Sequence, residues 1–246
     1  MSNSLIRNIE ITAHRGVSNI YPENTMLAFY GAKELNADFI ELDVQQTKDK
    51  NIVVSHDQNL KRTANTNKNI IDLTYEEISK IDVGSYKDEK FKDEKIPLLK
   101  DVLEFAKDND IKLNIELKVN NKETDFEQQI IDLINEYNMK DNVILASFSY
   151  NSLVNIKNID SSFKTAYLTN NIINDIEYLD NVDIYSIEQY NINEDLVKRI
   201  HNVNKKIYAW TVDDKNMINK MINLNVDNII TNNVELTKNI LKSHLN

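Results

Sequence analysis

The sequence contains no cysteine, two prolines and three glycines among its 246 residues. Without cysteine, the chain cannot form disulfide bonds, thiolate nucleophiles or cysteine-based zinc sites. It also lacks any run near 18 apolar residues, so we predict no membrane-spanning helix. The N-terminal stretch "MSNSLIRNIEIT" has neither the apolar core nor the cleavage pattern of a signal peptide. These absences predict a cytoplasmic protein with no integral membrane segment.

The net charge of the chain disfavours nucleic acid and anionic membranes as partners. Lysine and arginine total 29 against 39 aspartate and glutamate residues, which gives a net charge of −10. Long-range electrostatics therefore disfavour nucleic acid and anionic membranes. An acidic protein that handles an anionic substrate needs local cations, either a metal ion or placed arginine and lysine side chains. Hydrophobic residues make up 41% of the chain, which is enough for a folded core.

Short β-type runs alternate with helical patterns along the chain. Eight barrel strands are predicted, at residues 9–14, 38–44, 112–119, 142–148, 164–168, 182–188, 206–212 and 227–231. The helical patterns lie near residues 24–35, 98–109, 123–138, 150–158, 171–178, 193–203, 214–223 and 234–243. Because parallel strands need crossover helices, this alternation predicts an α/β fold. Eight such units close into a (β/α)8 TIM barrel, here a single domain over residues 1–246.

One further strand-like run breaks the alternation. "NIVVSHD" (51–57) follows the strand at 38–44 after the short turn "KDKN". Parallel pairing is impossible across so short a link, so the two runs form an antiparallel hairpin. With the turn centred on "DK", Asp43 lies opposite His56 on the C-terminal rim of the barrel.

Residues 57–97 form an insertion between this hairpin and the next barrel helix. Within it, "LTYEEISKI" predicts a short helix with Thr74 and Glu77 as a capping box. "GSYKDEKFKDEK" is polar and charged, which predicts a solvated loop. A separate domain of about 40 residues without a metal or disulfide would be marginally stable. We therefore expect the insertion to cap the barrel mouth as part of the single domain.

The segment "ITAHRGVSNIYPENTMLAFYGA" concentrates residues that are rare elsewhere in the chain. Gly16 permits a sharp turn that directs the preceding His-Arg pair into the barrel mouth. Pro22 and Glu23 are typical of a helix start, here at Asn24. Gly31 then allows this helix to approach the barrel closely.

Alternation along the strands decides which side chains face the barrel interior. Three strands place polar side chains on the inner face near their C-terminal ends: Thr12 and His14; Glu41 and Asp43; Asn114, Glu116 and Lys118. Burying three carboxylates together without a cation costs several kcal/mol per charge. A divalent cation bound by carboxylate oxygens removes that cost, so Glu41, Asp43 and Glu116 predict a metal site.

Each of these features has an ordinary structural interpretation when taken alone. Glu-x-Asp in a strand is usually a solvated edge, and Glu116 with Lys118 fits a surface ion pair. His14 and His56 are compatible with core or loop positions. Together, however, these polar groups all fall at the C-terminal ends of barrel strands, where barrel enzymes place their active sites.

Several ordered motifs carry a resemblance to a known family. "AHRG", "PENT", "ADFIELDVQQTKDKNIVVSHDQNLKRT", "DLTYEEI", "IPLLKDVL", "LNIELK", "AWTV" and "VDNIIT" follow one another along nearly the whole chain. This set resembles the glycerophosphodiester phosphodiesterase family. The resemblance implies a TIM barrel with an inserted segment that helps to shape the leaving-group pocket.

The resemblance also implies roles for nine residues. They are His14 and His56 as general acid and base; Glu41, Asp43 and Glu116 as ligands of one divalent cation; Arg15 and Lys118 on the phosphate; and Phe148 and Trp210 as an apolar wall beside the glycerol or leaving group. Mg²⁺ or Ca²⁺ is the usual ion of the family, and Mn²⁺ is a further option. Both aromatic side chains also fit simple packing at the barrel rim.

The chain departs from the family pattern at three asparagines. The family often has glycine in place of Asn36 and Asn228, and aspartate in place of Asn232. Because asparagine tolerates left-handed backbone, we expect these residues to substitute at turns. Asn232 removes the carboxylate that usually ends the last strand.

The function implied by the resemblance is metal-dependent hydrolysis of glycerophosphodiesters to glycerol 3-phosphate and an alcohol. The alternatives are a lysophospholipase D-like phosphodiesterase, a catalytically inactive phosphodiester-binding barrel, or another metal-dependent barrel enzyme. The expected partner is a small-molecule substrate, and a homodimer stays open. The head group, the acid/base assignment of the histidines, and cyclic-phosphate formation versus direct water attack stay open as well.

Overall fold

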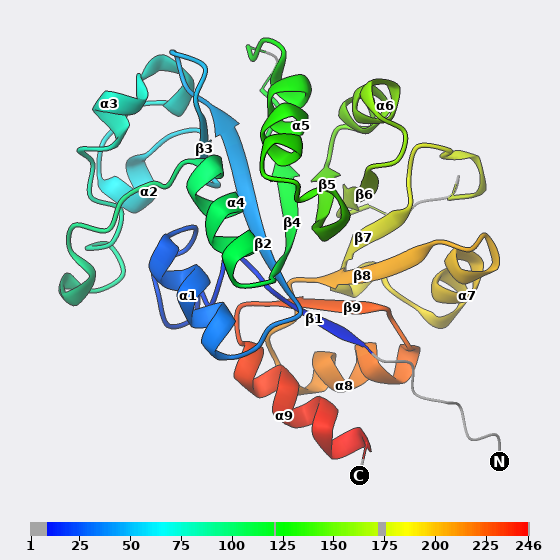
Figure 1. Ribbon diagram of the computed structural model, residues 1–246. Helices are drawn as coiled ribbons and strands as arrows, with labels where there is room; N and C mark the ends of the chain where they lie inside the picture. Colours follow the sequence, from blue (N-terminus) through cyan, green and yellow to red (C-terminus); the bar gives the residue numbers. More distant parts are fainter. Residues whose placement is uncertain (1–8, 121, 172–175, 246) are drawn as a thin grey trace, which may run out of the picture.

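The computed structural model describes residues 9–120, 122–171 and 176–245, and it contains a closed parallel barrel (Figure 1). The barrel strands are β1 (Glu10–Ala13), β2 (Phe39–Gln46), β4 (Lys112–Leu117), β5 (Val143–Ser147), β6 (Lys164–Thr169), β7 (Ile184–Glu188), β8 (Lys206–Trp210) and β9 (Asn228–Thr231). Each strand pairs with its neighbours in parallel, and β1 closes the ring by pairing with both β2 and β9. The predicted (β/α)8 barrel is confirmed.

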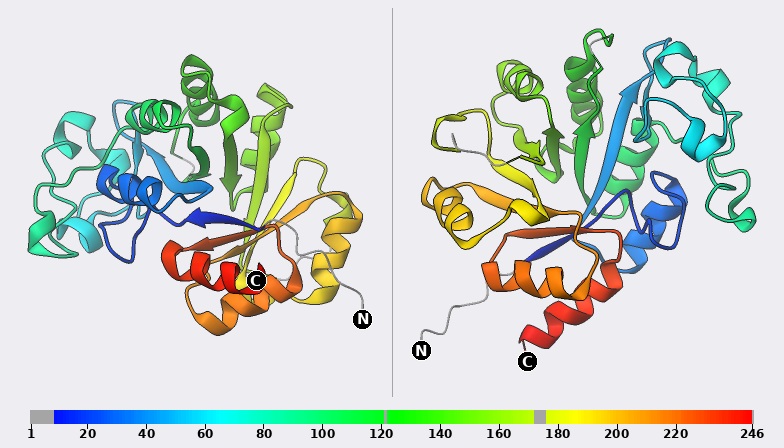
Figure 2. Two further views of the ribbon diagram at one scale, coloured as in Figure 1. Left: turned by 60° about the horizontal axis from the view of Figure 1, so that its bottom comes forward. Right: turned by 180° about the vertical axis from the view of Figure 1, so that it is seen from behind.

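Helices surround the barrel on its outer side (Figure 2). They are α1 (Met26–Glu34), α4 (Leu99–Asp108), α5 (Phe126–Glu136), α6 (Tyr150–Ile159), α7 (Glu194–Asn202), α8 (Lys215–Leu224) and α9 (Val234–Leu245). After β6, the described residues form only the 3-10 turn η4 (Ile176–Tyr178); the rest of the helix predicted at 171–178 falls largely on residues 172–175, outside the described part. None of the described helices has the length and apolarity needed to span a membrane.

Side-chain alternation on the strands produces two apolar layers. Side chains that point outward form the larger cluster with the helices, and the inward cluster fills the middle of the barrel. The inward cluster consists of Phe39, Ile144, Ala146, Ala166, Leu168, Ile184, Tyr208 and Ile230. Apolar side chains fill most of this level, with the hydrogen-bonded pair Thr12 and Asn228 beside Phe39 and Tyr208. The charged inward residues of β2 and β4 follow at the C-terminal end.

The strand β3 (Ile52–Val54) pairs antiparallel with β2, as the sequence predicted. The predicted register is wrong by one residue, because Asp43 lies opposite Ser55, whose N–H donates to the Asp43 carbonyl at 2.9 Å. The cause is the turn. Lys50 adopts a left-handed conformation (φ 63°), which closes a five-residue loop between the strands.

The segment after β3 forms a lobe beside β3 and α4 (Figures 1 and 2). It contains α2 (Lys61–Ala64), η1 (Ile70–Asp72), α3 (Tyr75–Ile78) and η2 (Glu89–Phe91). The predicted Thr74–Glu77 capping box is present on α3. The lobe has its own apolar cluster, formed by Val53, Leu60, Ile70, Leu73, Ile78, Val83, Ile96 and Leu98. The prediction of a solvated loop is therefore wrong in part, since Phe91 within "GSYKDEKFKDEK" is buried and packs edge-on against Tyr21.

The loop between β1 and α1 differs from the prediction at two points. The helix begins at Met26 with Thr25 as its N-cap, because Asn24 is left-handed (φ 57°) and stays outside the helix. A Cβ on Gly31 would lie 2.5 Å from the Tyr21 ring. This glycine therefore allows the Tyr21 ring to pack close to α1, and the predicted close approach to the barrel is not its role. Gly16 does form the predicted turn, with φ 79°.

The asparagine substitutions occupy different environments. Asn36 is left-handed (φ 51°), as expected for a turn. Asn228 is not at a turn: it lies buried in β9 and accepts a hydrogen bond from the Thr12 hydroxyl at 2.8 Å. The turn prediction for Asn228 is therefore wrong, because the position needs a polar partner inside the barrel.

We predict that Gly84→Ala destabilises the lobe. An added Cβ would lie 1.8 Å from the carbonyl oxygen of Phe91, so the backbone must shift. Overpacking of this kind costs about 1–3 kcal/mol, measurable as a lower free energy of unfolding in urea. Lys92→Ala, at an exposed site nearby, is the control and should change stability little. Equal stability of both variants would contradict the packing described for this segment.

Candidate active site

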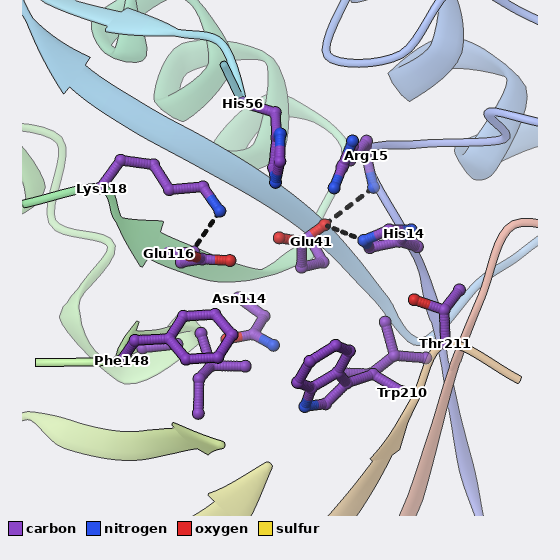
Figure 3. A pocket seen from close by; sticks show the side chains of 13 residues that line it. His14, Arg15, Glu41, His56, Asn114, Glu116, Lys118, Phe148, Trp210 and Thr211 are labelled. Atoms are coloured by element: carbon purple, nitrogen blue, oxygen red, sulfur yellow. Dashed lines mark hydrogen bonds and ion pairs between the residues drawn. The ribbon is translucent and has the colours of Figure 1, made fainter. Parts of the chain in front are cut away.

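A cavity of about 100 Å³ opens at the C-terminal ends of the barrel strands (Figure 3). Its lining includes eight of the nine predicted site residues: His14, Arg15, Glu41, His56, Glu116, Lys118, Phe148 and Trp210. The ninth, Asp43, is 1% exposed and contacts Arg15 and Lys118 at the edge of the cavity. The fold therefore brings together residues that are up to 196 positions apart in the sequence (from His14 to Trp210).

Three buried carboxylates form the base of the site. One oxygen from each of Glu41, Asp43 and Glu116 lies within 4.8 Å of the others. Burial and the charge of Asp43 raise the pKa of Glu116 to about 7. Burial, with repulsion from both neighbouring carboxylates, also raises the pKa of Glu41. For Asp43, burial acts in the same direction, but Lys118 and Arg15 outweigh it and lower the pKa below its usual range.

These carboxylates fit a divalent cation. Oxygen ligands converging from β2 and β4 match the preference of Mg²⁺ and Ca²⁺. Burial, together with repulsion between the carboxylates, raises the pKa of Glu41 and of Glu116. A bound cation would favour the ionised form of both groups.

Arg15 is held at the cavity by both its backbone and its side chain. Its N–H donates to Glu41 Oε2 at 2.8 Å, from a left-handed backbone (φ 57°). Its Nε lies 3.3 Å from Asp43 Oδ2, and its Nη1 lies 2.8 Å from Glu23 Oε1. The guanidinium is therefore fixed beside the carboxylate cluster, where it can bind an anion without moving.

Lys118 follows the end of β4 and also reaches the carboxylates. Its Nζ lies 2.5 Å from Glu116 Oε1 and 3.0 Å from Asp43 Oδ1. The same ammonium stands 6.0 Å from the centroid of the Phe148 ring. It is thus placed between the acidic base of the cavity and its aromatic wall.

His14 is held by an amide. Its Nδ1 lies 2.8 Å from Asn232 Oδ1, and its Nε2 lies 4.0 Å from Glu41 Oε2. The Asn232 amide nitrogen donates to Asp213 at 2.6 Å, which turns the amide oxygen toward the imidazole. The His14 Nδ1 therefore carries the proton, and Nε2 faces the cavity. Burial and the Arg15 charge lower the pKa of His14 to about 4.

His56 is held by a carboxylate instead. Its Nδ1 lies 2.8 Å from Asp57 Oδ1, and the second Asp57 oxygen accepts from Arg62 Nε at 2.6 Å. Burial lowers the pKa of His56, while the nearby Asp43 charge opposes that change. In Figure 3 the imidazole points into the cavity from the side opposite Phe148.

The aromatic wall is formed by Phe148 and Trp210. Their rings meet edge to face, with centroids 5.7 Å apart. The indole N–H of Trp210 donates to the Ser186 carbonyl at 2.9 Å, which fixes the ring against the barrel. Phe148 is 45% exposed, so its ring is not buried in the core and can contact a ligand.

Four supporting residues were given no role in the site from the sequence, although Asn114 was predicted to lie on the inner face of its strand. Asn24 donates to Asp43 Oδ2 at 2.8 Å, while Asp57 and Asn232 hold the two histidines. Asn114 is 1% exposed and lines the cavity, and its Oδ1 has no hydrogen-bond partner among the described residues. Asn24 and Asp57 belong to the Pro-Glu-Asn-Thr and His-Asp motifs, which were visible in the sequence.

Around one cavity the barrel places two histidines, two cationic side chains and three carboxylates. These are the residue types that metal-assisted phosphodiester hydrolysis uses. The model of the glycerophosphoryl diester phosphodiesterase family matches residues 14–236. The chain belongs to this family and is an enzyme of its class.

Relatives and solved structures agree with this assignment. The chain is 39% identical over 236 residues to a glycerophosphodiester phosphodiesterase of Caldanaerobacter subterraneus subsp. tengcongensis, covering 94% of this chain and 97% of the relative. A phosphodiesterase of Oleispira antarctica, solved with the product sn-glycerol-3-phosphate, has a TM-score of 0.90 at 25% identity, covering 95% and 96% of the two chains. A human lysophospholipase D is 39% identical over 144 residues, 56% of this chain and 45% of the relative.

We predict that metal binding releases protons. Because the pKa of Glu116 is raised to about 7, this carboxyl is partly protonated near neutral pH and must ionise to bind a cation, and the raised pKa of Glu41 acts in the same direction. Affinity for Mg²⁺ should therefore rise as the pH increases through about 7. Isothermal titration calorimetry in buffers of different protonation enthalpy would count the protons.

The matched variant is Glu116→Gln. It should bind Mg²⁺ at least about 10-fold more weakly and release fewer protons. Binding without proton release at neutral pH, in the wild-type protein, would argue against the three-carboxylate site.

Proposed function

We propose that the protein hydrolyses glycerophosphodiesters to glycerol 3-phosphate and an alcohol, using one divalent cation and two histidines. The observation that carries this proposal is the convergence of His14, His56, Arg15 and Lys118 on a cavity beside three buried carboxylates, two of which line it. The family membership and the product complex of the Oleispira antarctica relative support the same substrate class.

In this proposal Arg15 and Lys118 bind the phosphate, and Glu41, Asp43 and Glu116 hold Mg²⁺, Ca²⁺ or Mn²⁺. Both cationic side chains already lie beside the carboxylates, so they require little reorganisation when negative charge develops in the transition state. A cation held by these carboxylates would supply positive charge to offset the charge of the phosphate.

The histidines would transfer the protons. With a pKa near 4, His14 is unprotonated at neutral pH, so its Nε2 suits a general base that takes the proton of the attacking hydroxyl. Burial lowers the pKa of His56 as well, but its contact with the Asp57 carboxylate favours the imidazolium, so of the two histidines His56 is the better general acid. A new P–O bond then forms to the attacking oxygen, the ester P–O bond breaks, and His56 gives its proton to the departing alcohol.

Phe148 and Trp210 would form the wall for the glycerol arm, with Asn114 as a polar group below it. The amide of Asn114 lines the cavity and has an unpaired acceptor, which fits a hydroxyl of the glycerol. In this proposal the segment 57–97 borders the leaving-group side of the cavity, since it contains Arg62 and also Asp57, which contacts His56.

A cytoplasmic location and a homodimer remain predictions.

Lysophospholipase D activity is the second candidate, because of the human relative. Such a substrate carries an acyl chain on its glycerol arm and needs a long apolar channel. The apolar lining of the cavity is limited to Ala146, Phe148, Leu168, Trp210 and Ile230. We therefore favour diesters without an acyl chain. A catalytically inactive barrel is disfavoured, since all nine proposed site residues are retained.

The direct test is release of glycerol 3-phosphate from the choline, ethanolamine, glycerol and inositol diesters, with chelator and with each metal restored. We expect metal-dependent release, and loss of activity in Glu41→Ala and Asp43→Ala with the fold retained by circular dichroism. Full activity in either variant would contradict the metal assignment. Release only from lysophospholipids would favour the second candidate.

The acid/base assignment predicts a dependence on the leaving group. His56→Ala should slow hydrolysis of glycerophosphocholine by about 10²–10⁴-fold, but slow a p-nitrophenyl diester much less, because nitrophenolate departs without protonation. His14→Ala should slow both substrates to a similar degree. The reverse pattern in steady-state kinetics would exchange the two roles.

A further inference from the structure

Arg62 joins the lobe to both sides of the active site. It lies on α2, and its guanidinium contacts two carboxylates at once. Nε donates to Asp57 Oδ2 at 2.6 Å, while Nη1 and Nη2 donate to the two oxygens of Glu23 at 2.6 and 2.7 Å. Three N–H donors of the Arg62 guanidinium therefore bind two carboxylates, Asp57 and Glu23, which lie on separate loops.

One branch of this network ends at His56. Asp57 uses its second oxygen, Oδ1, to accept from the His56 Nδ1–H at 2.8 Å. Hydrogen bonds from Arg62 lower the pKa of Asp57 against the effect of its burial, so this carboxylate is ionised and acts only as an acceptor. The imidazole is thereby held with Nδ1 protonated and Nε2 toward the cavity.

The other branch ends at Arg15. Glu23 Oε1 accepts from both Arg62 Nη2, at 2.7 Å, and Arg15 Nη1, at 2.8 Å. Without Arg62, Glu23 would keep Arg15 and the Tyr86 hydroxyl, which lies 3.5 Å from Oε2, but it would lose the two hydrogen bonds that fix both of its oxygens. The position of the Arg15 guanidinium depends on that orientation and on Asp43.

We propose that Arg62 is a positioning residue that sets the orientation of His56 through Asp57 and of Arg15 through Glu23. This inference rests on the proposed function for the catalytic roles of His56 and Arg15. Arg62 itself is 45% exposed and lies outside the lining of the catalytic cavity, so it acts through its two carboxylate partners rather than on substrate. A bidentate ion pair within a network can also add stability, so the comparable pair between Arg199 and Glu177 is needed to separate positioning from stabilisation.

The geometry requires arginine. The planar guanidinium of arginine can donate to two carboxylates with three N–H groups in fixed directions. The ammonium of lysine is a single point charge on a flexible chain. Arg62→Lys therefore keeps the charge and loses the planar guanidinium, which makes it the informative conservative variant.

The kinetic test compares Arg62→Ala, Arg62→Lys and Arg199→Ala on a glycerophosphodiester. Arg199 forms the matched control, because it also contacts both oxygens of one glutamate, Glu177, far from the cavity. We expect kcat to fall at least about 10-fold in both Arg62 variants, with melting temperatures close to that of Arg199→Ala. Added guanidinium should restore part of the activity of Arg62→Ala and none of it in Arg62→Lys. Wild-type kcat in both Arg62 variants would overturn the proposal.

A second readout does not need enzymatic activity. The ¹⁵N resonances of neutral His56 report which ring nitrogen carries the proton. We expect the Nδ1-protonated form in the wild-type protein and in Arg199→Ala, and a mixture of tautomers in Arg62→Ala and Arg62→Lys. An unchanged His56 signal in both Arg62 variants would overturn the inference. A changed signal in a protein that cleaves no glycerophosphodiester would uphold the positioning role and reject the proposed function.

Discussion

The mutual repulsion of three buried carboxylates is the constraint on which the rest of the site depends. One oxygen from each of Glu41, Asp43 and Glu116 lies within 4.8 Å of the others, and burial together with repulsion between the carboxylates raises the pKa of Glu41 and of Glu116. Arg15 and Lys118 offset part of the charge, and both contact Asp43. The protein thus supplies two positive charges for three negative ones, and the remaining imbalance favours a cation and then an anionic phosphate.

The barrel keeps the charged cluster at its C-terminal end, apart from its apolar core. Apolar side chains such as Ile144, Ala166 and Tyr208 fill most of the middle of the barrel, away from the charged C-terminal end. Barrels commonly divide stability and chemistry in this way. The lobe after β3 repeats the division on a small scale, because its apolar cluster around Leu60 and Ile78 supports α2, which presents Arg62 to the active-site loops.

The sequence predicted the features that depend on local periodicity. Alternation along β2 and β4 was enough to place Glu41, Asp43 and Glu116 on one inner face, and eight strand–helix repeats were enough for the barrel. Features that depend on a single backbone conformation were missed: left-handed Lys50 shifted the hairpin register, and left-handed Asn24 delayed the helix start. The contact between Arg62 and Glu23 spans 39 residues and depends on how the lobe docks, which no local pattern contains.

The two histidines illustrate how neighbouring groups differentiate chemically identical side chains. His56 touches the Asp57 carboxylate directly, whereas His14 touches the neutral amide of Asn232, and the Asp213 carboxylate lies one hydrogen bond further away. Asparagine at 232 therefore moves the negative charge away from the imidazole without removing it. Since attraction between charges weakens with distance, His14 gains less stabilisation of its protonated form than His56 does. Burial beside Arg15 acts in the same direction, so the difference in proton affinity between the rings is built from their surroundings.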